Sequence, residues 1–204
     1  MSSQINDDQL DSENKSVTIS RKTKETDIEL SLNINGSQKL DIKTGLGFFD
    51  HMLEQLASHA RWDLSIKVGG DLEVDDHHTV EDVAICLGEA LQKNWRGLSS
   101  MQRYGQRLMP MDEALIMAAV DLSGRGIYVG EIPFTRENLG DVSTEMFAHF
   151  FNTFATSSAM TLHINPMYFK NNHHLAEGCF KAVAYALKEA LSSSPGNNTT
   201  KGVL

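Results

Sequence analysis

The sequence has few of the features that mark secreted, membrane and nucleic-acid-binding proteins. Two cysteines are too few for a disulfide framework, and we expect both, Cys86 and Cys179, to be small core residues of a reduced protein. No apolar run approaches the length of a membrane span, and the polar, acidic N-terminus is unlike a signal or transit peptide. A formal net charge of −9 argues against wrapping nucleic acid. We therefore expect a cytoplasmic protein without a membrane or nucleic-acid partner.

The composition that is present is typical of a globular protein. With 41% hydrophobic and 22% charged residues, the 204-residue chain can bury a sizeable core as one compact domain or as two small fused halves. Residues 1–15 are polar and without periodicity, which predicts a disordered N-terminal tail. Residues 192–204 form a second tail, which opens as a linker and ends with a TTKG segment before its last two residues.

Between the tails, the same order of features occurs twice, over residues 16–100 and 101–191. In the first half, the patterns predict strands over 17–23, 27–36 and 62–68, and helices over 45–60 and 77–91. In the second half, they predict strands over 114–124, 126–133 and 160–166, and helices over 144–155 and 173–191. An internal duplication of a βαβα-type unit follows, in the α+β class. We expect a pseudo-twofold arrangement of the halves, with helices packed between two sheets.

The most specific feature of the repeat is a histidine pair followed by a glutamate. It reads HHTVE in the first half and HHLAE in the second, at His77, His78, Glu81, His173, His174 and Glu177. His51 and His149 occupy corresponding places on the first helix of each half. On a helix, a carboxylate three or four residues after a histidine lies on the same side, one turn along. Converging imidazoles and carboxylates are ligands typical of a borderline transition metal.

The two histidines of a pair are not expected to bind the same ion. Adjacent helical residues project about 100° apart, because the helix has roughly 3.6 residues per turn. His77 and His78 would then serve two ions, in different copies of the protein. Distributed over two ions, the eight ligands give each ion three histidines and one carboxylate. This set leaves open positions on an octahedral ion such as Mn²⁺, whereas it would nearly saturate Zn²⁺.

Other residues near the histidines have two interpretations. His59 lies on the same helical face as His51, with Gln55 between them, and is either a site residue or an ordinary surface or core histidine. His163 alternates within a strand, which favours an ordinary surface or core histidine over a site residue. Four neighbouring carboxylates either accept hydrogen bonds from the imidazoles or cap helices: Asp50, Asp75, Asp76 and Asp82.

Four basic residues of this acidic chain are candidates for binding an anion: Arg103, Arg125, Lys181 and Lys201. Lys181 lies one helical turn beyond Glu177, so its ammonium group can approach the metal ligands. Lys201 lies in the TTKG segment, whose hydroxyls and backbone amides can wrap an anion. Each residue taken singly is also compatible with a solvated surface charge, and spacing alone does not bring the four together.

Three longer motifs make the sequence similar to a known family. They are LGFFDHM at Leu46–Met52, DDHHTVEDV at Asp75–Val83 and NNHHLAEGCFKA at Asn171–Ala182. With PMDEAL, VDLSGR and the closing TKG, the chain resembles imidazoleglycerol-phosphate dehydratase over nearly all of Val17–Leu204. The resemblance implies two ribosomal protein S5 domain 2-like halves and a 24-subunit homo-oligomer with active sites at subunit interfaces. It also implies two Mn²⁺ ions per active site.

The resemblance further implies roles for individual residues. The implied metal ligands are His51, His77, His78, Glu81, His149, His173, His174 and Glu177. The implied catalytic residues are Glu25, His51, His78, His174 and Glu177. The implied contacts to the substrate or its phosphate are made by Glu25, His51, Gln55, His59, His77, Arg103, Arg125, Lys181, Thr199, Thr200 and Lys201. The chain departs from the family pattern at Phe169 (usually Gly), Gly126 (usually Pro) and Thr199 (usually Ser).

The implied reaction is loss of water from imidazole glycerol phosphate to give imidazole acetol phosphate in histidine biosynthesis. Because the proton removed is not next to a carbonyl, the imidazole ring must accept the electrons, and we expect the ions to act as Lewis acids. Glu25 is the residue we expect to handle protons. A dinuclear phosphate-ester hydrolase and a non-catalytic metal-binding oligomer are the alternatives. The first favours carboxylate-rich ligand sets, and the second gives no reason for the cationic residues.

Overall fold

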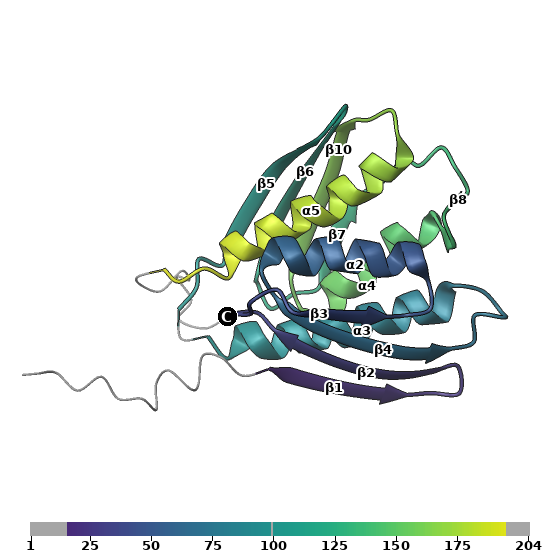
Figure 1. The fold of residues 1–204 in the computed structure, drawn as a ribbon. Coiled ribbons are helices and arrows are strands. Elements are labelled where there is room, and N and C mark those ends of the chain that lie inside the picture. The colour runs from purple at the N-terminus through teal and green to yellow at the C-terminus, as the bar shows by residue number, and fades with distance from the viewer. Residues whose placement is uncertain (1–15, 99, 195–204) are drawn as a thin grey trace, which may run out of the picture.

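The computed structural model describes residues 16–98 and 100–194 of the chain (Figure 1). The predicted N-terminal tail of residues 1–15 and the TTKG residues Thr199, Thr200 and Lys201 lie outside the described residues. Among the helices of the described part, none combines the length and the apolar character that crossing a bilayer requires.

The first sheet comes from the N-terminal half of the chain. Its strands are β1 (Val17–Lys22), β2 (Thr26–Asn33), β3 (Leu40–Lys43) and β4 (Asp63–Gly70). They lie in the order β1-β2-β4-β3, with β3 parallel to β4 and the other pairs antiparallel. Ile28, Leu30 and Leu32 of β2 are buried at alternate positions, as the period of a strand requires. One face of the sheet is therefore directed at the core.

The second sheet repeats this plan. Its strands are β5 (Tyr104–Met111), β6 (Ala114–Asp121), β7 (Ile127–Gly130) and β10 (Thr161–Tyr168). They lie in the order β5-β6-β10-β7, and again only the last pair, β7 and β10, is parallel. The shared strand order and the shared place of the parallel pair confirm the predicted α+β class and the internal duplication.

The helices lie between the two sheets (Figure 1). They are α2 (Gly47–Ala60), α3 (His77–Arg96), α4 (Glu145–Ser157) and α5 (Asn172–Ala190). Helices of different halves pack side by side, α2 with α5 and α3 with α4. The two helices of each pair run parallel. Between α2 and α5, His51 lies beside His173 and His59 beside Tyr185. At the ends of α3 and α4, the indole Nε1 of Trp95 donates to the Ser158 carbonyl at 2.9 Å. Each half therefore contributes one helix to each pair.

An aromatic cluster fills the centre between the helices. Its fully buried members are Phe49, Phe147, Phe150, Phe151, Phe154 and Phe180. The rings of Phe151 and Phe180 approach to 4.7 Å between centroids, and those of Phe49 and Phe150 to 5.5 Å in an edge-to-face arrangement. Rings at these spacings contribute to stability beyond their buried area. The core thus joins α2, α4 and α5 across the boundary between the halves.

The structure extends or adds to the predicted elements at a few places. Helix α3 continues to Arg96, beyond the predicted end at residue 91, because Trp95 is buried against α4. Strands β3 and β5 were absent from the prediction, as was the hairpin of β8 (Asn138–Leu139) and β9 (Val142–Ser143). The boundary expected between residues 100 and 101 falls in the connection from α3 to β5; as a domain boundary it stays a prediction.

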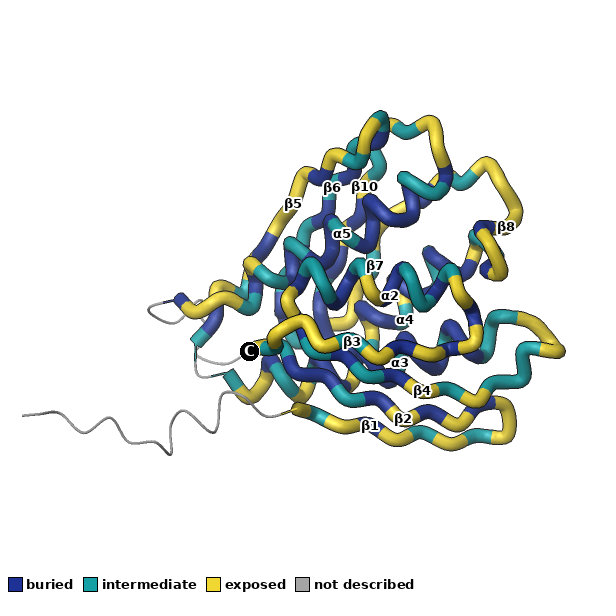
Figure 2. The backbone as a smooth tube through the Cα atoms, in the orientation of Figure 1, coloured by how far each residue is buried: buried dark blue, intermediate teal, exposed yellow. Residues whose placement is uncertain are grey.

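The two sheets differ in the side chains that they expose on the faces that point away from the helices; Figure 2 marks the exposed positions along the backbone. The first sheet exposes polar and charged side chains, namely Thr18, Ser20, Asp27, Glu29, Asp41, Lys43 and Lys67. The second sheet exposes large apolar ones, namely Tyr104, Leu108, Ile127, Val129 and Met167. An apolar patch of this kind is typical of a surface that contacts another protein.

Candidate metal centres

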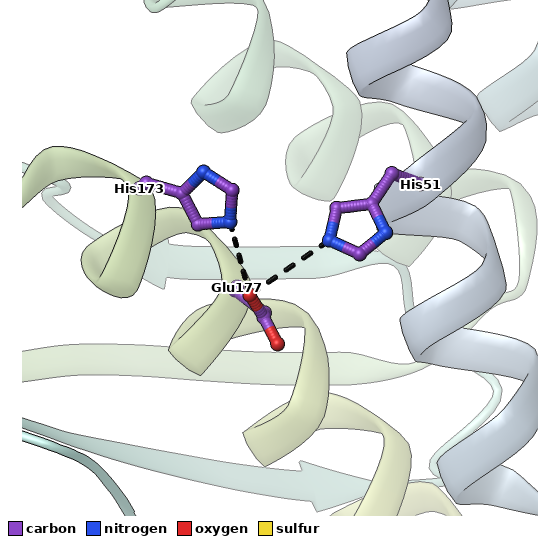
Figure 3. Close-up of side chains that lie close together, drawn as sticks. All are labelled: His51, His173 and Glu177. Carbon is purple, nitrogen blue, oxygen red and sulfur yellow. Dashed lines mark hydrogen bonds and ion pairs between the residues drawn. The ribbon is translucent and has the colours of Figure 1, made fainter.

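The first cluster of possible metal ligands lies where α2 meets α5. His51 projects from α2 toward His173 and Glu177 on α5 (Figure 3). The Nε2 atoms of His51 and His173 lie 3.8 Å and 3.1 Å from the same carboxylate oxygen of Glu177. His173 and Glu177 are four residues apart, so one turn of α5 places them together.

The second cluster lies where α4 meets α3 and has the same composition. His149 projects from α4 toward His77 and Glu81 on α3. Its Nε2 lies 3.1 Å from Glu81, and the Nε2 of His77 lies 4.0 Å from the same carboxylate. The rings of His77 and His149 are 4.7 Å apart between centroids.

The two clusters are related by the internal duplication, and each combines residues of both halves. One joins the first helix of the first half to the last helix of the second half, and the other joins the remaining two helices. In both, ligand atoms of two histidines and one glutamate lie within 4.8 Å of one another. Imidazole nitrogens with a single carboxylate oxygen suit Mn, Fe, Co, Ni or Zn better than Mg or Ca, which prefer oxygen. These donor atoms fit a divalent transition metal.

The remaining histidine of each pair points elsewhere. The rings of His77 and His78 are 6.1 Å apart with an interplanar angle of 76°, and those of His173 and His174 are 6.2 Å apart at 85°. His78 and His174 therefore turn away from the cluster on their own helix, as the helical geometry predicts.

Two carboxylates hold these outward rings, and neither was among the predicted partners. The Nδ1 of His78 lies 3.0 Å from Asp71, just after β4, and the Nδ1 of His174 lies 2.8 Å from Glu113, in the turn between β5 and β6. The hydrogen bond from His174 lowers the pKa of Glu113 to about 2. The hydrogen bond to Asp71 raises the pKa of His78. Asp71 and Glu113 come from loops that helical spacing does not connect to the histidines.

The carboxylates that were expected beside the imidazoles have other partners. Asp75 accepts a hydrogen bond from the N–H of His77 at 2.9 Å, at the start of α3. Asp82 accepts from Arg21 Nε and from the hydroxyl of Thr26. Asp50 accepts from the N–H and hydroxyl of Thr44. Of the two interpretations, these contacts favour a structural role.

The β8–β9 hairpin holds the helix starts that carry the ligands. Asp141, in its turn, accepts hydrogen bonds from the N–H groups of Gly47 and Phe48 at 2.5 Å and 3.0 Å, which caps α2. Ser143 donates its N–H and its hydroxyl to Asp76, immediately before α3. The hairpin thus fixes the ends of α2 and α3 relative to α4, which follows it in sequence.

Comparison with known proteins agrees with this geometry. A family model for imidazoleglycerol-phosphate dehydratase matches residues 44–187. The imidazoleglycerol-phosphate dehydratase of Clostridium acetobutylicum is 48% identical over 192 residues, which cover 94% of this chain and 96% of the relative. That of Cereibacter sphaeroides is 47% identical, with coverage of 91% and 97%. The chain belongs to the imidazoleglycerol-phosphate dehydratase family. It is a family of hydro-lyases of histidine biosynthesis.

A solved structure carries the same fold. The crystal structure of the imidazoleglycerol-phosphate dehydratase of Staphylococcus aureus superposes with a TM-score of 0.81 at 31% identity, and covers 88% of this chain and all of that chain. The corresponding protein of Pyrococcus furiosus gives a TM-score of 0.80 at 34% identity, with coverage of 91% and 100%.

Polar residues predicted to contact the substrate follow the first cluster along α2 and α5. Lys181 donates to Glu177 at 2.6 Å, one turn further along α5. Gln55 and His59 follow His51 along α2, and the ring of His59 lies 5.4 Å from that of Tyr185. Burial and the nearby Lys181 lower the pKa of His59. His163 is exposed on β10.

The two predicted phosphate-binding arginines lie at the opposite end of the second sheet. The N–H of Arg103 donates to the carbonyl of Ala190 at 2.8 Å, and its side chain pairs with Asp121 at 2.7 Å. Arg125 follows β6 at the same end. Between Glu177 and Ala190, α5 rises by about 20 Å at 1.5 Å per residue. Within one chain the structure therefore does not bring Arg103 to the first metal cluster.

Two of the departures from the family pattern lie in the described residues. A Cβ atom at Gly126 would come within 2.5 Å of the Thr156 Cα atom, so the backbone there packs directly on α4 and has no room for the usual proline. Phe169 is partly buried and packs against the core at the end of β10. It occupies the place after the strand that Asp71 occupies in the first half.

Proposed function

We propose that this protein catalyses the Mn²⁺-dependent dehydration of imidazole glycerol phosphate to imidazole acetol phosphate, with two Mn²⁺ ions per active site. The observation that carries the proposal is the pair of matched His-His-Glu clusters in a chain of this family. When bound, the ions would supply Lewis acidity to the imidazole ring of the substrate. Manganese is preferred over zinc because an octahedral ion keeps positions open for that ring.

The ligand count supports active sites between subunits. Each cluster supplies two histidines and one glutamate, and the outward-facing His78 and His174 would each complete the set of an ion held by a neighbouring chain. The 20 Å spacing along α5 supports the same conclusion, because the glycerol chain of the substrate is too short to reach from a metal cluster to Arg103 of the same chain.

Self-association into a 24-subunit particle is part of the proposal. The apolar outer face of the second sheet, with Tyr104, Leu108, Ile127 and Val129 about half exposed, supports contact with another protein surface. The polar outer face of the first sheet is suited to solvent. Sedimentation of the purified protein with and without Mn²⁺ tests the size of the particle.

The chain's own residues would bind and orient the substrate. Lys181, Gln55 and His59 lie one to two helical turns beyond the first cluster on α5 and α2 and would contact the glycerol phosphate. Arg103 and Arg125 of a neighbouring chain, with Thr199, Thr200 and Lys201, would hold the phosphate. Binding energy at this remote group would orient the reacting carbons.

Glu25 is the proposed proton-handling residue. It lies in the turn between β1 and β2, its side chain is half exposed, and its Oε1 atom is 3.9 Å from Nε2 of His78. A carboxylate beside a metal-ligand histidine is placed to exchange protons with a substrate bound there. His51, His78, His174 and Glu177 would act in catalysis through the ions they hold.

Replacement of Glu25 tests this role. In Glu25→Gln the side chain keeps its shape and loses its ability to take up a proton, so turnover should fall by about 10²–10⁴-fold while Mn²⁺ and substrate still bind. Turnover that stays within about tenfold of the parent would reject the assignment. Glu29→Gln, on the polar outer face of the first sheet, is the matched control and should leave turnover unchanged.

One assay separates the proposal from its alternatives. The Mn²⁺-loaded protein is incubated with imidazole glycerol phosphate, and both ketone and inorganic phosphate are measured. Ketone supports the dehydratase, free phosphate would support a phosphate-ester hydrolase, and neither product would support a metal-binding oligomer without catalysis.

A further inference from the structure

The outward-facing histidines are held in the same way in both halves. The Nδ1 of His78 lies 3.0 Å and 3.2 Å from the two carboxylate oxygens of Asp71, and the Nδ1 of His174 lies 2.8 Å from Glu113. In both cases the hydrogen bond is to Nδ1, while Nε2 lies 3.9 Å from Glu25 in His78 and 3.7 Å from Asp112 in His174. In the two clusters, the histidines face the glutamate with Nε2. His78 and His174 differ, because they contact a carboxylate through Nδ1.

The two carboxylates are themselves anchored. The other oxygen of Glu113 accepts the N–H of Asn171 at 2.8 Å, directly before α5. Asp71 is fixed through its backbone, since its N–H donates to the Glu25 carbonyl at 3.1 Å and its carbonyl accepts the N–H of Val74 at 2.8 Å. Glu113 is held by a second hydrogen bond to its carboxylate and Asp71 by its backbone, so each favours one orientation of its histidine ring.

This arrangement selects one tautomer. An ionised carboxylate accepts hydrogen bonds and donates none, so the ring nitrogen that faces it must carry the proton. In the neutral ring, Nε2 then keeps its lone pair, which is the form that coordinates a metal ion. Nε2 of each ring is thereby in the form that can coordinate an ion, and neither ring belongs to the His-His-Glu cluster on its own helix.

We propose that Asp71 and Glu113 are positioning residues that fix His78 and His174 as Nδ1–H tautomers, with Nε2 available to an ion bound by a neighbouring chain. The inference rests on the proposed function, since it assigns these carboxylates to the metal site suggested there. Neither residue contacts the substrate or the ion in this proposal; each acts through its histidine.

The two halves reach this arrangement with carboxylates from different places. Glu25 and Glu113 correspond, because each stands directly before the second strand of its hairpin, and Asp71 and Phe169 correspond, because each directly follows the last strand. In the first half Asp71 takes the Nδ1 contact and leaves Glu25 3.9 Å from Nε2. In the second half Phe169 has no carboxylate to offer, and Glu113 makes the contact itself. Glu113 therefore compensates for the absence of a carboxylate at Phe169.

Replacement of Glu113 by Gln gives a sharp test. One oxygen remains to accept the Asn171 N–H, and the amide nitrogen then faces His174, where it donates to Nδ1. This donation stabilises the Nε2–H tautomer, which has no lone pair for a metal. Affinity for Mn²⁺, measured by electron paramagnetic resonance on the full chain, should fall by about 10–100-fold.

Glu113→Ala separates tautomer control from a structural role. Alanine removes the contact to Asn171, so the metal-free protein should be less stable than Glu113→Gln. It also leaves Nδ1 free to donate to water, so Mn²⁺ should bind more tightly than to Glu113→Gln. A merely structural role predicts the opposite order of affinities, and that result would overturn the proposal.

Two further variants complete the series. Asp71→Asn should cost less affinity than Glu113→Gln, because both Asp71 oxygens face His78 and an amide can turn its oxygen toward the ring. Glu189→Gln is the control, since this α5 carboxylate accepts only the N–H of Gln106 among its described hydrogen bonds, and Mn²⁺ affinity should not change. Unchanged affinity in Glu113→Gln would reject the inference while leaving the metal site standing; absence of Mn²⁺ binding in the parent would reject the proposed function instead.

Discussion

The two halves of the chain share a backbone plan but differ in the side chains that surround it. Both have the same strand order, the same parallel pair at one edge and the same cluster of two histidines and one glutamate. Their outer sheet faces differ in polarity, and the carboxylate that holds the outward histidine comes from a different loop in each. The comparison teaches that the candidate metal ligands keep corresponding positions in the two halves, while the outer faces and the supporting carboxylates differ.

The helix starts confirm how closely the backbone plan was kept. Asp75 and Asn171 each accept the N–H of the residue two positions on, which is the first histidine of the pair. The next residues, Asp76 and Asn172, each bind the connection that precedes α4. Asp76 accepts the N–H and the hydroxyl of Ser143, whereas Asn172 accepts the N–H of Thr135 and donates its amide N–H to the Thr135 hydroxyl at 2.9 Å. These six hydrogen bonds join corresponding positions in the two halves, although the side chains are charged in one half and neutral in the other and the bond to the hydroxyl runs in opposite directions.

The largest effect is expected from removing one cluster at a time. His51→Ala should lose the ion between α2 and α5, and His149→Ala the ion between α3 and α4. A missing Lewis acid withholds several kcal/mol from the transition state, so turnover should fall by a factor on the order of 10³. Elemental analysis should find half of the parent's Mn²⁺ in either variant. Loss of all metal from one variant alone would break the equivalence of the two clusters.

A stability experiment compares the two helix pairs. A Cβ atom at Gly88 would lie 2.6 Å from Ser157 Cβ and 3.0 Å from the Phe154 carbonyl on α4, whereas the corresponding position of α5 is already Ala184. Gly88→Ala should force α3 and α4 apart and lower the free energy of unfolding by about 1–3 kcal/mol. Urea denaturation measures the change. Gly69→Ala, with nothing within 4 Å of the added carbon, is the control, and an equal loss there would remove the packing explanation.

The smallest effect concerns pH and compares His59 with His78. Burial lowers the pKa of His59 below 6.5, so its contribution to the stability of the metal-free protein is complete above pH 6.5 and is lost as the pH falls through the lowered value. The raised pKa of His78 has the opposite effect. The contribution of His78 to the stability of the metal-free protein is complete below pH 6.5 and is lost as the pH rises. His59→Gln should flatten the acid side of the stability profile and leave the alkaline side unchanged. A profile that is equally steep below pH 6.5 would contradict the burial of this ring.

Much of the fold could be predicted from the sequence because buried strands alternate and buried helices repeat every turn. β2, β6 and the four helices have these patterns, and all were found. β5 was missed because it is an edge strand with Pro110 inside it and with Tyr104 and Leu108 exposed, so its apolar residues do not mark its buried face. β3 has only four residues, too few for a period to be recognised.

The candidate site was predictable to the extent that helical spacing and the repeat define it. Histidines and glutamates one turn apart could be placed together, and the grouping of His51 with His173 and Glu177 required the packing of α2 on α5. Asp71 and Glu113 could not be found, because Glu113 reaches His174 from 61 positions away along the chain and Asp71 reaches His78 through a loop. The residues Thr199, Thr200 and Lys201 lie outside the described part, so their phosphate contact stays a prediction.

The β8–β9 hairpin makes it difficult to study one half of the chain as a separate fragment. The connection before the first helix is short in one half, at residues 44–46, and long in the other, at residues 131–144. The longer connection breaks the symmetry of the two halves, because it forms hydrogen bonds with Asp76 and with the start of α2. A fragment that ended near residue 100 would keep the first sheet but lose the hydrogen bonds from the hairpin to the starts of α2 and α3. Complementation of separately expressed halves should therefore depend on residues 131–144, which only the second half encodes.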